Sequence, residues 1–534
     1  MIDRLGKKLV WLAAVIGMAL AIWSTRLGPG VGGDATIYLT SAQNLVKGIG
    51  LGLIQPDGSF RLLPYSAPLF PLLLTPFSAL HLDLTAAARW INILLFGGMI
   101  LLAGFASLRY FENKWQAALP AWLLACSPIL LPVYSWAMAE PLTLLPGFGG
   151  LVFILTNLDR QPTGRIGWLE LSGLLFGLSI AARYSAAAFL AAGMLICLFW
   201  MAAPLKKRLL AVLRIGLVGF LPLAIWVLVQ FTQTASVSSR SILTLAEMRE
   251  RFLAFWPQVN SALLVWILPA SFQESPPYPQ WINMILPLTM IVMLAAVSIF
   301  MKKRDMTKSS DRLISTLWIF AAVYVGVLLL VYLTTYPPIT IDNRMLSPAH
   351  VAVIWIAGLL LAQLTGLKTS HLWQTGVFLL AAASILWYGM RTIRIVQQNA
   401  ETGLGYNALT WRQSQLIEAI KVLPEDQPLV TNETMALLYL TGRVASPVAE
   451  IYFDKPVYPF TRYGDGPAGR DPAEARFKAA ESLLVVFDTL ESQFSTIYGE
   501  RAKERADVFV QGLHVAAFGD NGAMYYHPLT SSEN

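Results

Sequence analysis

Charged residues are scarce in this sequence. Only 13% of its 534 residues are charged, whereas 56% are hydrophobic, and the mean hydropathy is +0.56. Soluble domains carry roughly 25% charged residues, so this composition excludes an ordinary soluble protein and indicates an integral membrane protein. The net charge is +7. Because the basic residues are scattered through short loops rather than gathered in one patch, the charge does not indicate a nucleic-acid partner.

Cysteine is also rare. The only two cysteines, Cys126 and Cys197, lie inside apolar runs, where a thiol behaves as a small hydrophobic group. No disulfide framework can be read, and no Cys-His spacing suggests a zinc site. The first apolar run, Leu9 to Trp23, has the basic flank of a signal peptide. No clear cleavage site follows it, so we interpret the run as a membrane span.

Long apolar runs are abundant. Those able to cross a hydrocarbon core of about 30 Å lie at 9–25, 87–107, 117–134, 138–157, 168–182, 185–202, 212–231, 283–301, 313–333, 346–366 and 372–390. We therefore expect an α-helical polytopic membrane protein with about eleven transmembrane helices.

Basic residues alternate in density between successive loops. The richer set contains Arg4, Lys7, Lys8, Arg109, Lys114, Arg160, Arg165, Lys206, Lys207, Arg208, Arg214, Lys302, Lys303, Arg304, Lys308, Arg312 and Lys368. Loops rich in lysine and arginine stay in the cytoplasm, so the amino terminus is predicted to be cytoplasmic. An odd number of spans then places everything after residue 390 outside. The two long outer loops are 26–86 and 232–282.

The composition changes near residue 397, where charges become frequent. Leu483 to Phe487 is a continuous apolar run, which is typical of a buried strand. Leu429 to Thr431 reads as a second strand, and the turn Gly519 to Gly522 predicts a hairpin. Helices are expected at 409–422, 433–441, 472–481 and 490–505. We therefore predict a membrane domain over 1–396 and a soluble extracytoplasmic α/β domain over 397–534.

The first outer loop opens with a helix that starts with an acid. Read as a helix, Asp34 to Lys47 is amphipathic and suited to an interface. One face carries Asp34, Ile37, Tyr38, Ser41 and Leu45, and the opposite face carries Thr36, Thr40, Gln43 and Lys47. Asp34 would point at whatever lies above the bilayer. The simpler alternative is that Asp34 only caps this helix, because Asp after glycine is a favoured N-cap.

The other polar candidates also lie at the predicted outer ends of spans. Span centres are nearly free of charge, which disfavours an ion-coupled transporter, because such proteins keep ionisable groups near the midplane. The candidate set is Asp34, Tyr38, Tyr65, Glu140, Arg183, Arg240, Arg344 and His350.

Most of these residues have a simpler explanation. Glu140 suits the dipole at a helix start, and Arg183 could reach lipid headgroups from a turn. Arg344 could form an exposed ion pair with Asp342. His350 could be a packing histidine, and Tyr65 could shape a proline-rich return of the first loop.

Taken together, the candidates predict chemistry on a lipid phosphate. A carboxylate at the membrane surface can deprotonate a hydroxyl nucleophile. Arginines at the same level can bind a phosphate bidentately and stabilise it as it leaves. A lipid-linked phosphate sugar needs this arrangement, with its tail in the bilayer and its sugar outside.

Several short motifs resemble a known family. Gly33-Asp34 followed by Tyr38, Ala42, Leu45 and Gly48, with Pro68-Leu69-Phe70-Pro71 further on, resembles the first outer loop of GT-C class membrane glycosyltransferases. The motifs are similar to those of protein O-mannosyltransferases and of the aminoarabinose transferase that modifies lipid A. Ser135 to Glu140 resembles their second acidic motif, and Arg344 to Pro348 resembles their Arg-Tyr-x-x-Pro element. The resemblance covers roughly residues 1–390.

The resemblance implies an inverting sugar transfer. Asp34 would be the catalytic base, Glu140 an accessory acid near the acceptor or a metal, and Arg344 a phosphate contact. The donor would be a polyprenyl-phosphate sugar and the acceptor a glycan, lipid or protein, in a bacterial inner membrane. Ala35 stands where many relatives have a second acid, and Met345 where an aromatic is usual. No cofactor is predicted, and a divalent metal is left open, because hard cations normally take several oxygen ligands.

Two other functions share these features. A polysaccharide polymerase or ligase acting on longer lipid-linked glycans would also use outer arginines, with a catalytic site in a late loop. A lipid-linked glycan transporter would move the substrate without covalent chemistry.

Overall fold

The structure is a computed structural model, which describes residues 2–63, 66–111, 115–160, 167–234, 241–242, 244–274, 278–304, 309–336, 339–365, 370–448 and 471–528. The chain forms two compact units. The first comprises Met1–Arg26, Pro64–Phe77 and Leu82–Glu401, and the second comprises Leu27–Leu63, Ser78–His81 and Thr402–Asn534.

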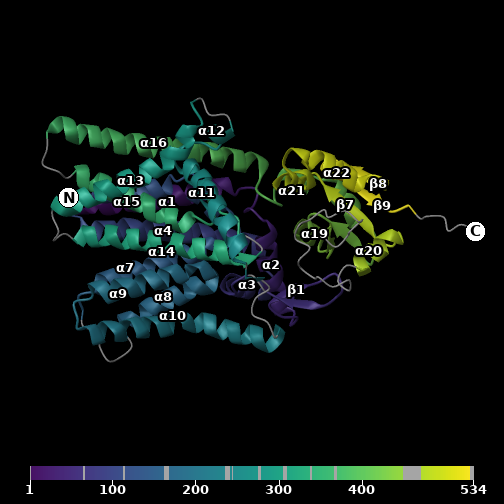
Figure 1. The fold of residues 1–534 in the computed structure, drawn as a ribbon, viewed down its shortest axis with the longest axis horizontal. Helices are drawn as coiled ribbons and strands as arrows, with labels where there is room; N and C mark the ends of the chain where they lie inside the picture. Colours follow the sequence, from purple (N-terminus) through teal and green to yellow (C-terminus); the bar gives the residue numbers. More distant parts are fainter. Residues whose placement is uncertain are drawn as a thin grey trace, which may run out of the picture. The chain divides into compact units, whose positions relative to one another are not determined.

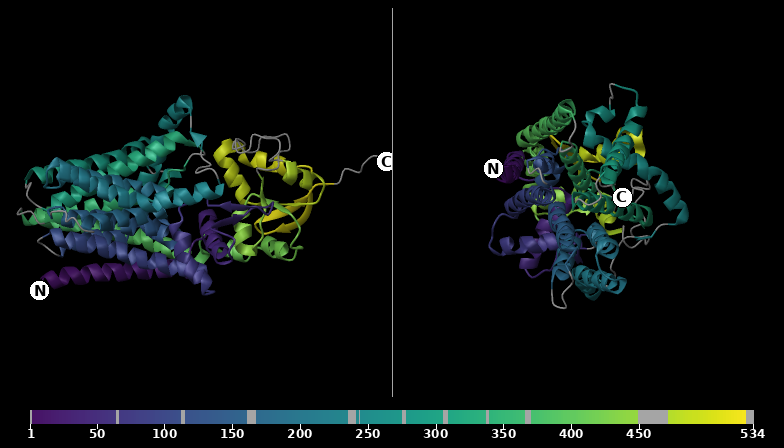
Figure 2. Two further views of the ribbon diagram at one scale, coloured as in Figure 1. Left: turned by 90° about the horizontal axis from the view of Figure 1, so that it is seen from below. Right: turned by 90° about the vertical axis from the view of Figure 1, so that its left-hand side faces the viewer.

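The first unit is a helical bundle whose long helices run side by side (Figures 1 and 2). Its helices are α1 (Ile2–Ser24), α3 (Leu69–Ala79), α4 (Leu84–Tyr110), α5 (Leu119–Ala125), α6 (Leu130–Ser135), α7 (Glu140–Asn157), α8 (Trp168–Ala182), α9 (Ala187–Trp200), α10 (Leu205–Thr234), α11 (Leu245–Ile267), α12 (Ser271–Glu274), α13 (Trp281–Arg304), α14 (Ser309–Thr334), α15 (Ser347–Thr365) and α16 (His371–Thr402). Two 3-10 turns, η1 (Gln116–Ala118) and η2 (Tyr184–Ala186), precede α5 and α9. A short strand pair joins β3 (Ser241–Ile242) to β4 (Thr335–Tyr336).

This unit spans a membrane several times. Among the described residues, seven helices are long and apolar enough to cross a bilayer: α1, α4, α10, α13, α14, α15 and α16. Shorter apolar helices include α3, α8 and α9, of which α8 packs against α10 and α9 packs against α10 and α14. Only 6% of the apolar part of α13 is buried within the protein. The exposed apolar surface of this helix therefore suits a hydrocarbon environment. The expected α-helical polytopic membrane protein is confirmed.

Small residues let α7, α8 and α9 approach closely. A Cβ at Gly150 would lie 2.5 Å from the ring of Phe176, and a Cβ at Gly193 would lie 2.6 Å from the same ring. Without these glycines the helices would have to separate, as at other small-residue interfaces between spanning helices. Phe148 and Phe189 pack edge to face beside them, with ring centroids 5.0 Å apart. This packing keeps the start of α7 beside the end of α8.

The span expected at 117–134 is wrong as one continuous helix. Helix α5 ends at Ala125 and α6 begins at Leu130. Pro128 interrupts the run, because proline removes a backbone donor and clashes with the preceding turn. The freed groups find other partners: the hydroxyl of Thr392 donates to the carbonyl of Cys126 at 2.6 Å.

The second outer loop contains a long helix. This is the 23-residue helix α11, Leu245–Ile267. Trp266, near the end of this helix, is only 2% exposed. Its indole N–H donates to Oδ1 of Asn343 at 2.9 Å, so this tryptophan ties the loop to the turn before α15.

The second unit contains a five-stranded sheet in the order β6-β5-β7-β9-β8. The strands are β5 (Leu429–Thr431), β6 (Ser446–Pro447), β7 (Leu483–Phe487), β8 (His514–Gly519) and β9 (Gly522–Tyr526). Strand β5 runs parallel to β6 and β7, whereas β9 is antiparallel to β7 and β8. The two predicted strands and the C-terminal hairpin are confirmed.

Two predicted helices of this unit are divided. The expected 409–422 helix is α17 (Leu409–Arg412) and α18 (Gln415–Lys421), because the hydroxyl of Ser414 starts a new helix by accepting from the backbone N–H of Ile417. The expected 490–505 helix is α21 (Thr489–Tyr498) and α22 (Ala502–Val510), separated at Gly499 with a positive φ of 57°. Helices α19 (Thr434–Thr441) and α20 (Asp471–Lys478) also belong to this unit.

Residues 27–63, expected as a loop of the membrane domain, pack with the C-terminal part of the chain. Helix α2 (Gly33–Val46) contacts α19, and β1 (Gly52–Ile54) pairs with β2 (Phe60–Leu62). The carbonyl of Val31 accepts from the backbone N–H of Tyr406 at 2.7 Å. Thr36, expected on the face opposite Asp34, is fully buried, so the face assignment is wrong for this residue. Gln43 and Lys47 of the same face are exposed.

Candidate functional site

A buried carboxylate lies at the start of α7. Glu140 is the first residue of this helix, followed by Pro141, and proline suits the first helical turn, where its missing N–H has no partner to lose. The turn before the helix is held by Asn92, whose side-chain amide donates to the carbonyls of Trp136 at 2.7 Å and Met138 at 3.2 Å. The side chain of Glu140 is only 4% exposed. Its charge therefore needs partners inside the protein.

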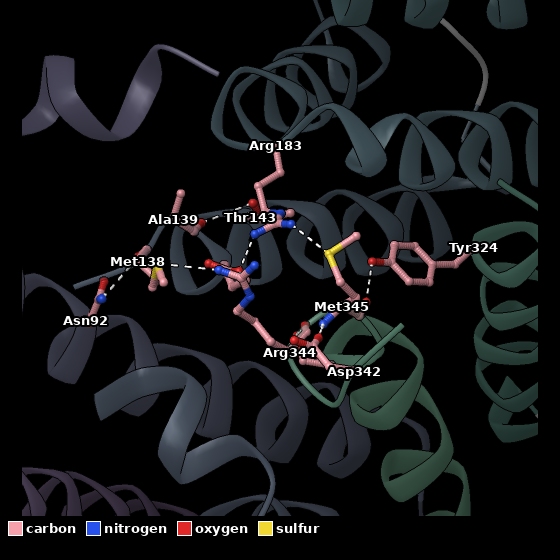
Figure 3. A network of polar contacts seen from close by, with 11 residues as sticks. Asn92, Met138, Ala139, Thr143, Arg183, Tyr324, Asp342, Arg344 and Met345 are labelled. Atoms are coloured by element: carbon pink, nitrogen blue, oxygen red, sulfur yellow. Dashed lines mark hydrogen bonds and ion pairs between the residues drawn. The ribbon is translucent and has the colours of Figure 1, made fainter. Parts of the chain in front are cut away.

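Arg183 provides the first partner. It follows α8 with extended backbone angles, φ −153° and ψ 131°, and this break directs its side chain toward α7 (Figure 3). Its Nη1 forms an ion pair with Oε1 of Glu140, and its Nη2 lies 2.9 Å from Sδ of Met345. The hydroxyl of Ser179 donates to the carbonyl of Thr143 at 2.7 Å, which ties the two helices together next to the pair.

Arg344 provides the second partner from the turn before α15. Its Nε lies 3.4 Å from Oε1 of Glu140, and its Nη1 lies 3.8 Å from Sδ of Met138. The turn itself is fixed by two bonds at Met345, drawn in Figure 3: its N–H donates to Oδ1 of Asp342 at 2.7 Å, and its carbonyl accepts from the hydroxyl of Tyr324 at 2.7 Å. The structure thus brings together Glu140, Arg183 and Arg344, which lie far apart in the sequence.

These side chains border a small hollow, with room for about one water molecule. Its lining residues are Glu140, Thr143, Arg183, Ser185, Tyr324, Arg344, Met345 and Pro348. Within the part of the chain that the structure describes, Oε2 of Glu140 has no hydrogen-bond partner. Two guanidinium groups facing one carboxylate leave an excess of positive charge, so the arrangement favours an anion.

The same arrangement does not suit a metal ion. Glu140 was expected to lie near the acceptor or a metal, but its carboxylate faces two cations, which would repel a third. Hard cations also need several oxygen ligands. Among the described residues, no group of three or more His, Cys, Asp or Glu side chains could hold a metal ion.

Asp34 and Tyr38 lie on α2 in the second unit. The N-cap of α2 is Gly32, so Asp34 is not the N-cap considered from the sequence. It occupies the first turn and is partly exposed, whereas Tyr38 is 4% exposed. Tyr65 and Arg240 lie outside the described residues.

His350 lies within α15 and is fully buried. Its Nε2 is 2.9 Å from the hydroxyl oxygen of Ser127. Its ring meets Trp266 edge on, with centroids 4.6 Å apart. These partners belong to the interior of the bundle, and His350 is not among the residues that line the hollow.

The sequence-based search missed three polar residues of the hollow: Thr143, Ser185 and Tyr324. Thr143 could have been found, because it lies one turn after Glu140 on the same helix face. Tyr324 lies in the middle of a continuous apolar run, α14. Nothing local distinguishes it from other buried tyrosines, and only the packing of α14 against α15 brings it to Met345.

The fold, a helical bundle with a C-terminal unit that contains a small sheet, is similar to that of two solved proteins. The crystal structure of ArnT from Cupriavidus metallidurans bound to undecaprenyl phosphate is similar, with a TM-score of 0.55 and 13% identity over 98% of both chains. The archaeal oligosaccharyltransferase AglB from Archaeoglobus fulgidus, in complex with an inhibitory peptide and a dolichol-phosphate, is similar with a TM-score of 0.57 and 13% identity. That match covers 99% of this chain and 75% of AglB. The sequence itself matches no known protein-family model and no curated protein.

Proposed function

We propose that this protein transfers a sugar from a polyprenyl-phosphate donor to an acceptor on the extracytoplasmic face of the membrane, with inversion at the anomeric carbon. The observation that carries the proposal is the convergence of Arg183 and Arg344 on Glu140 at one end of a spanning bundle. The fold supports it, because ArnT with undecaprenyl phosphate and AglB with a dolichol-phosphate share this architecture.

The two arginines would hold the donor phosphate. Their side chains are 19% and 33% exposed, so a ligand can reach guanidinium N–H groups while the surroundings stay partly desolvated. In such a place, charge-assisted hydrogen bonds to phosphate are stronger than in water. They stabilise the negative charge that develops on the phosphate as it leaves.

The reaction balances with Asp34 as general base. The acceptor hydroxyl oxygen attacks the anomeric carbon, the bond between that carbon and the phosphate oxygen breaks, and the lipid phosphate departs with the electron pair. Asp34 receives the hydroxyl proton. We expect a bacterial inner membrane, a cytoplasmic amino terminus and an extracytoplasmic C-terminal unit.

Transfer by purified protein tests the proposal. Reconstituted protein is incubated with a panel of polyprenyl-phosphate sugars, and release of polyprenyl phosphate is measured. Removing a general base typically costs about 10² to 10⁴ in rate, so Asp34→Asn should lose transfer by at least about 100-fold. Asp57→Asn is the matched control, because Asp57 lies in an exposed turn of the same unit, where it accepts from Ser59. Undiminished transfer by Asp34→Asn would remove Asp34 from the mechanism.

A longer lipid-linked glycan is the second candidate donor. AglB, an oligosaccharyltransferase, matches this chain over 99% of its length, and the same arginines would hold the phosphate of either donor. Parallel assays with monosaccharide and oligosaccharide donors separate the two, because a specific enzyme should turn over one class much faster.

A further inference from the structure

We infer that Glu140 is an internal substitute for the lipid phosphate: its carboxylate occupies the arginines while the site is empty and releases Arg344 when a phosphate binds. This inference rests on the proposed function, because it places the lipid phosphate on Arg344, one of the two arginines proposed there as phosphate ligands. It makes Glu140 a positioning residue that sets how tightly the lipid phosphate is held.

The two ion pairs are unequal. Arg183 is the less exposed arginine, and its Nη1 forms an ion pair with Oε1 of Glu140. Arg344 is 33% exposed, and its Nε is 3.4 Å from the same oxygen, longer than the 2.7–2.9 Å of strong charge-assisted bonds. Arg344 is therefore the partner that can be exchanged at lower cost, while Arg183 keeps its ion pair with Glu140.

The hollow excludes the simplest alternative, in which phosphate binds between Glu140 and the arginines. It has room for about one water molecule, and a phosphate group is considerably larger. A phosphate must therefore approach Arg344 from its exposed side. A phosphate that accepts from two N–H groups of this guanidinium in a bidentate contact competes with Glu140 for Arg344.

The carboxylate is not saturated, which suits such an exchange. Both arginines contact Oε1, and Oε2 is buried with no hydrogen-bond partner among the described residues. An anion held in this way keeps negative charge beside the phosphate site after Arg344 has moved. That charge opposes the phosphate ligand and favours its release.

The effect should differ between donor and product. A sugar-linked phosphodiester carries one negative charge, whereas a phosphate monoester carries about −1.5 to −2. Repulsion from Glu140 therefore weakens binding of the product more than binding of the donor. Neutralising Glu140 should strengthen product inhibition.

Binding of undecaprenyl phosphate to purified protein tests the inference without any sugar transfer. Glu140→Gln should bind this lipid about tenfold more tightly than the wild type. Tenfold corresponds to about 1.4 kcal/mol, which is less than the interaction of two unit charges a few ångströms apart near a protein surface. The matched control is Glu170→Gln. Glu170 pairs with Arg214 at 2.5 Å but lies at the other end of α8, about 20 Å from Arg183 at a rise of 1.5 Å per residue. The affinity of Glu170→Gln for undecaprenyl phosphate should therefore stay within about twofold of the wild type.

A conservative variant covers the case in which Glu140→Gln fails to fold. Glu140→Asp keeps the charge at the start of α7 but withdraws the carboxylate by one methylene, which loosens its hold on Arg344. We expect about threefold tighter binding of undecaprenyl phosphate. Unchanged or weaker binding in either folded variant would overturn the inference, because it would show that Glu140 prepares the arginines for phosphate rather than competing with it.

The outcomes separate the inference from the proposed function. Tighter lipid-phosphate binding by Glu140→Gln, with no transfer from any donor by the wild type, supports the inference and contradicts the proposed function. Transfer by the wild type without tighter binding by Glu140→Gln supports the proposed function and contradicts the inference. No binding of undecaprenyl phosphate by any variant overturns the inference.

Discussion

Two carboxylates, one in each unit, are satisfied in different ways. Glu433 in the second unit accepts from neutral groups on both oxygens: the hydroxyl of Thr489 at 2.8 Å and the amide of Gln493 at 3.1 Å reach Oε1, and the hydroxyl of Tyr406 at 3.1 Å reaches Oε2. Glu140 in the bundle contacts two guanidinium groups through Oε1 alone.

The difference separates a structural role from a chemical one. A carboxylate with both oxygens saturated by neutral donors stabilises its surroundings and has nothing to exchange. Burial, together with the charge of Glu433, raises the pKa of Tyr406, so its phenol remains a proton donor to the carboxylate. At Glu140 the partners are charged and partly exposed, and an incoming anion can compete for them.

The largest effect is expected from the arginine that a phosphate can reach. Arg344→Ala should lower the transfer rate by about 100- to 1,000-fold, the range seen when one donor to a developing negative charge is removed. Steady-state release of polyprenyl phosphate measures it. Arg312→Ala is the control, since its pair with Asp159 is half or more exposed on both sides. Equal losses in both variants would contradict a specific role for Arg344.

Removing the carboxylate should destabilise the bundle. Glu140→Ala leaves Arg183 and Arg344 facing one another without their shared anion, and breaking a buried pair by removing one partner costs about 3 to 5 kcal/mol. Because Arg344 is partly exposed, we expect the lower end, about 3 kcal/mol. Thermal unfolding in detergent measures the loss. Glu170→Ala removes a more exposed pair and should lower Tm much less.

A smaller effect is expected in the second unit. Tyr406→Phe removes one hydrogen bond to a charged acceptor, worth about 1.5 to 3 kcal/mol, while Glu433 keeps Thr489 and Gln493. Tm should fall modestly with transfer unchanged. Tyr439→Phe, which removes a bond of 3.0 Å to the neutral Oδ1 of Asn407, should cost about 1 kcal/mol. If Tyr406→Phe lost more transfer activity than folded protein, Glu433 would have a chemical role. The contrast between Glu433 and Glu140 would then not hold.

The positions of Glu140, Arg183 and Arg344 at helix ends could be predicted from the sequence, since hydropathy marks where apolar runs stop and polar residues there face the same boundary. Their mutual contacts could not be predicted, because they depend on which helices are neighbours. The close approach of α7, α8 and α9 at their glycines is a property of the packed bundle.

The sequence by itself determined that the chain crosses a membrane many times and ends in an α/β unit, because hydrophobic runs and strand periodicity are local properties. Only the tertiary structure decided that α5 and α6 are separate, that residues 27–63 pack with the C-terminal unit, and that two arginines share one carboxylate. Each of these depends on partners distant in the chain, which supply the hydrogen bonds and counter-charges that a local pattern leaves unassigned.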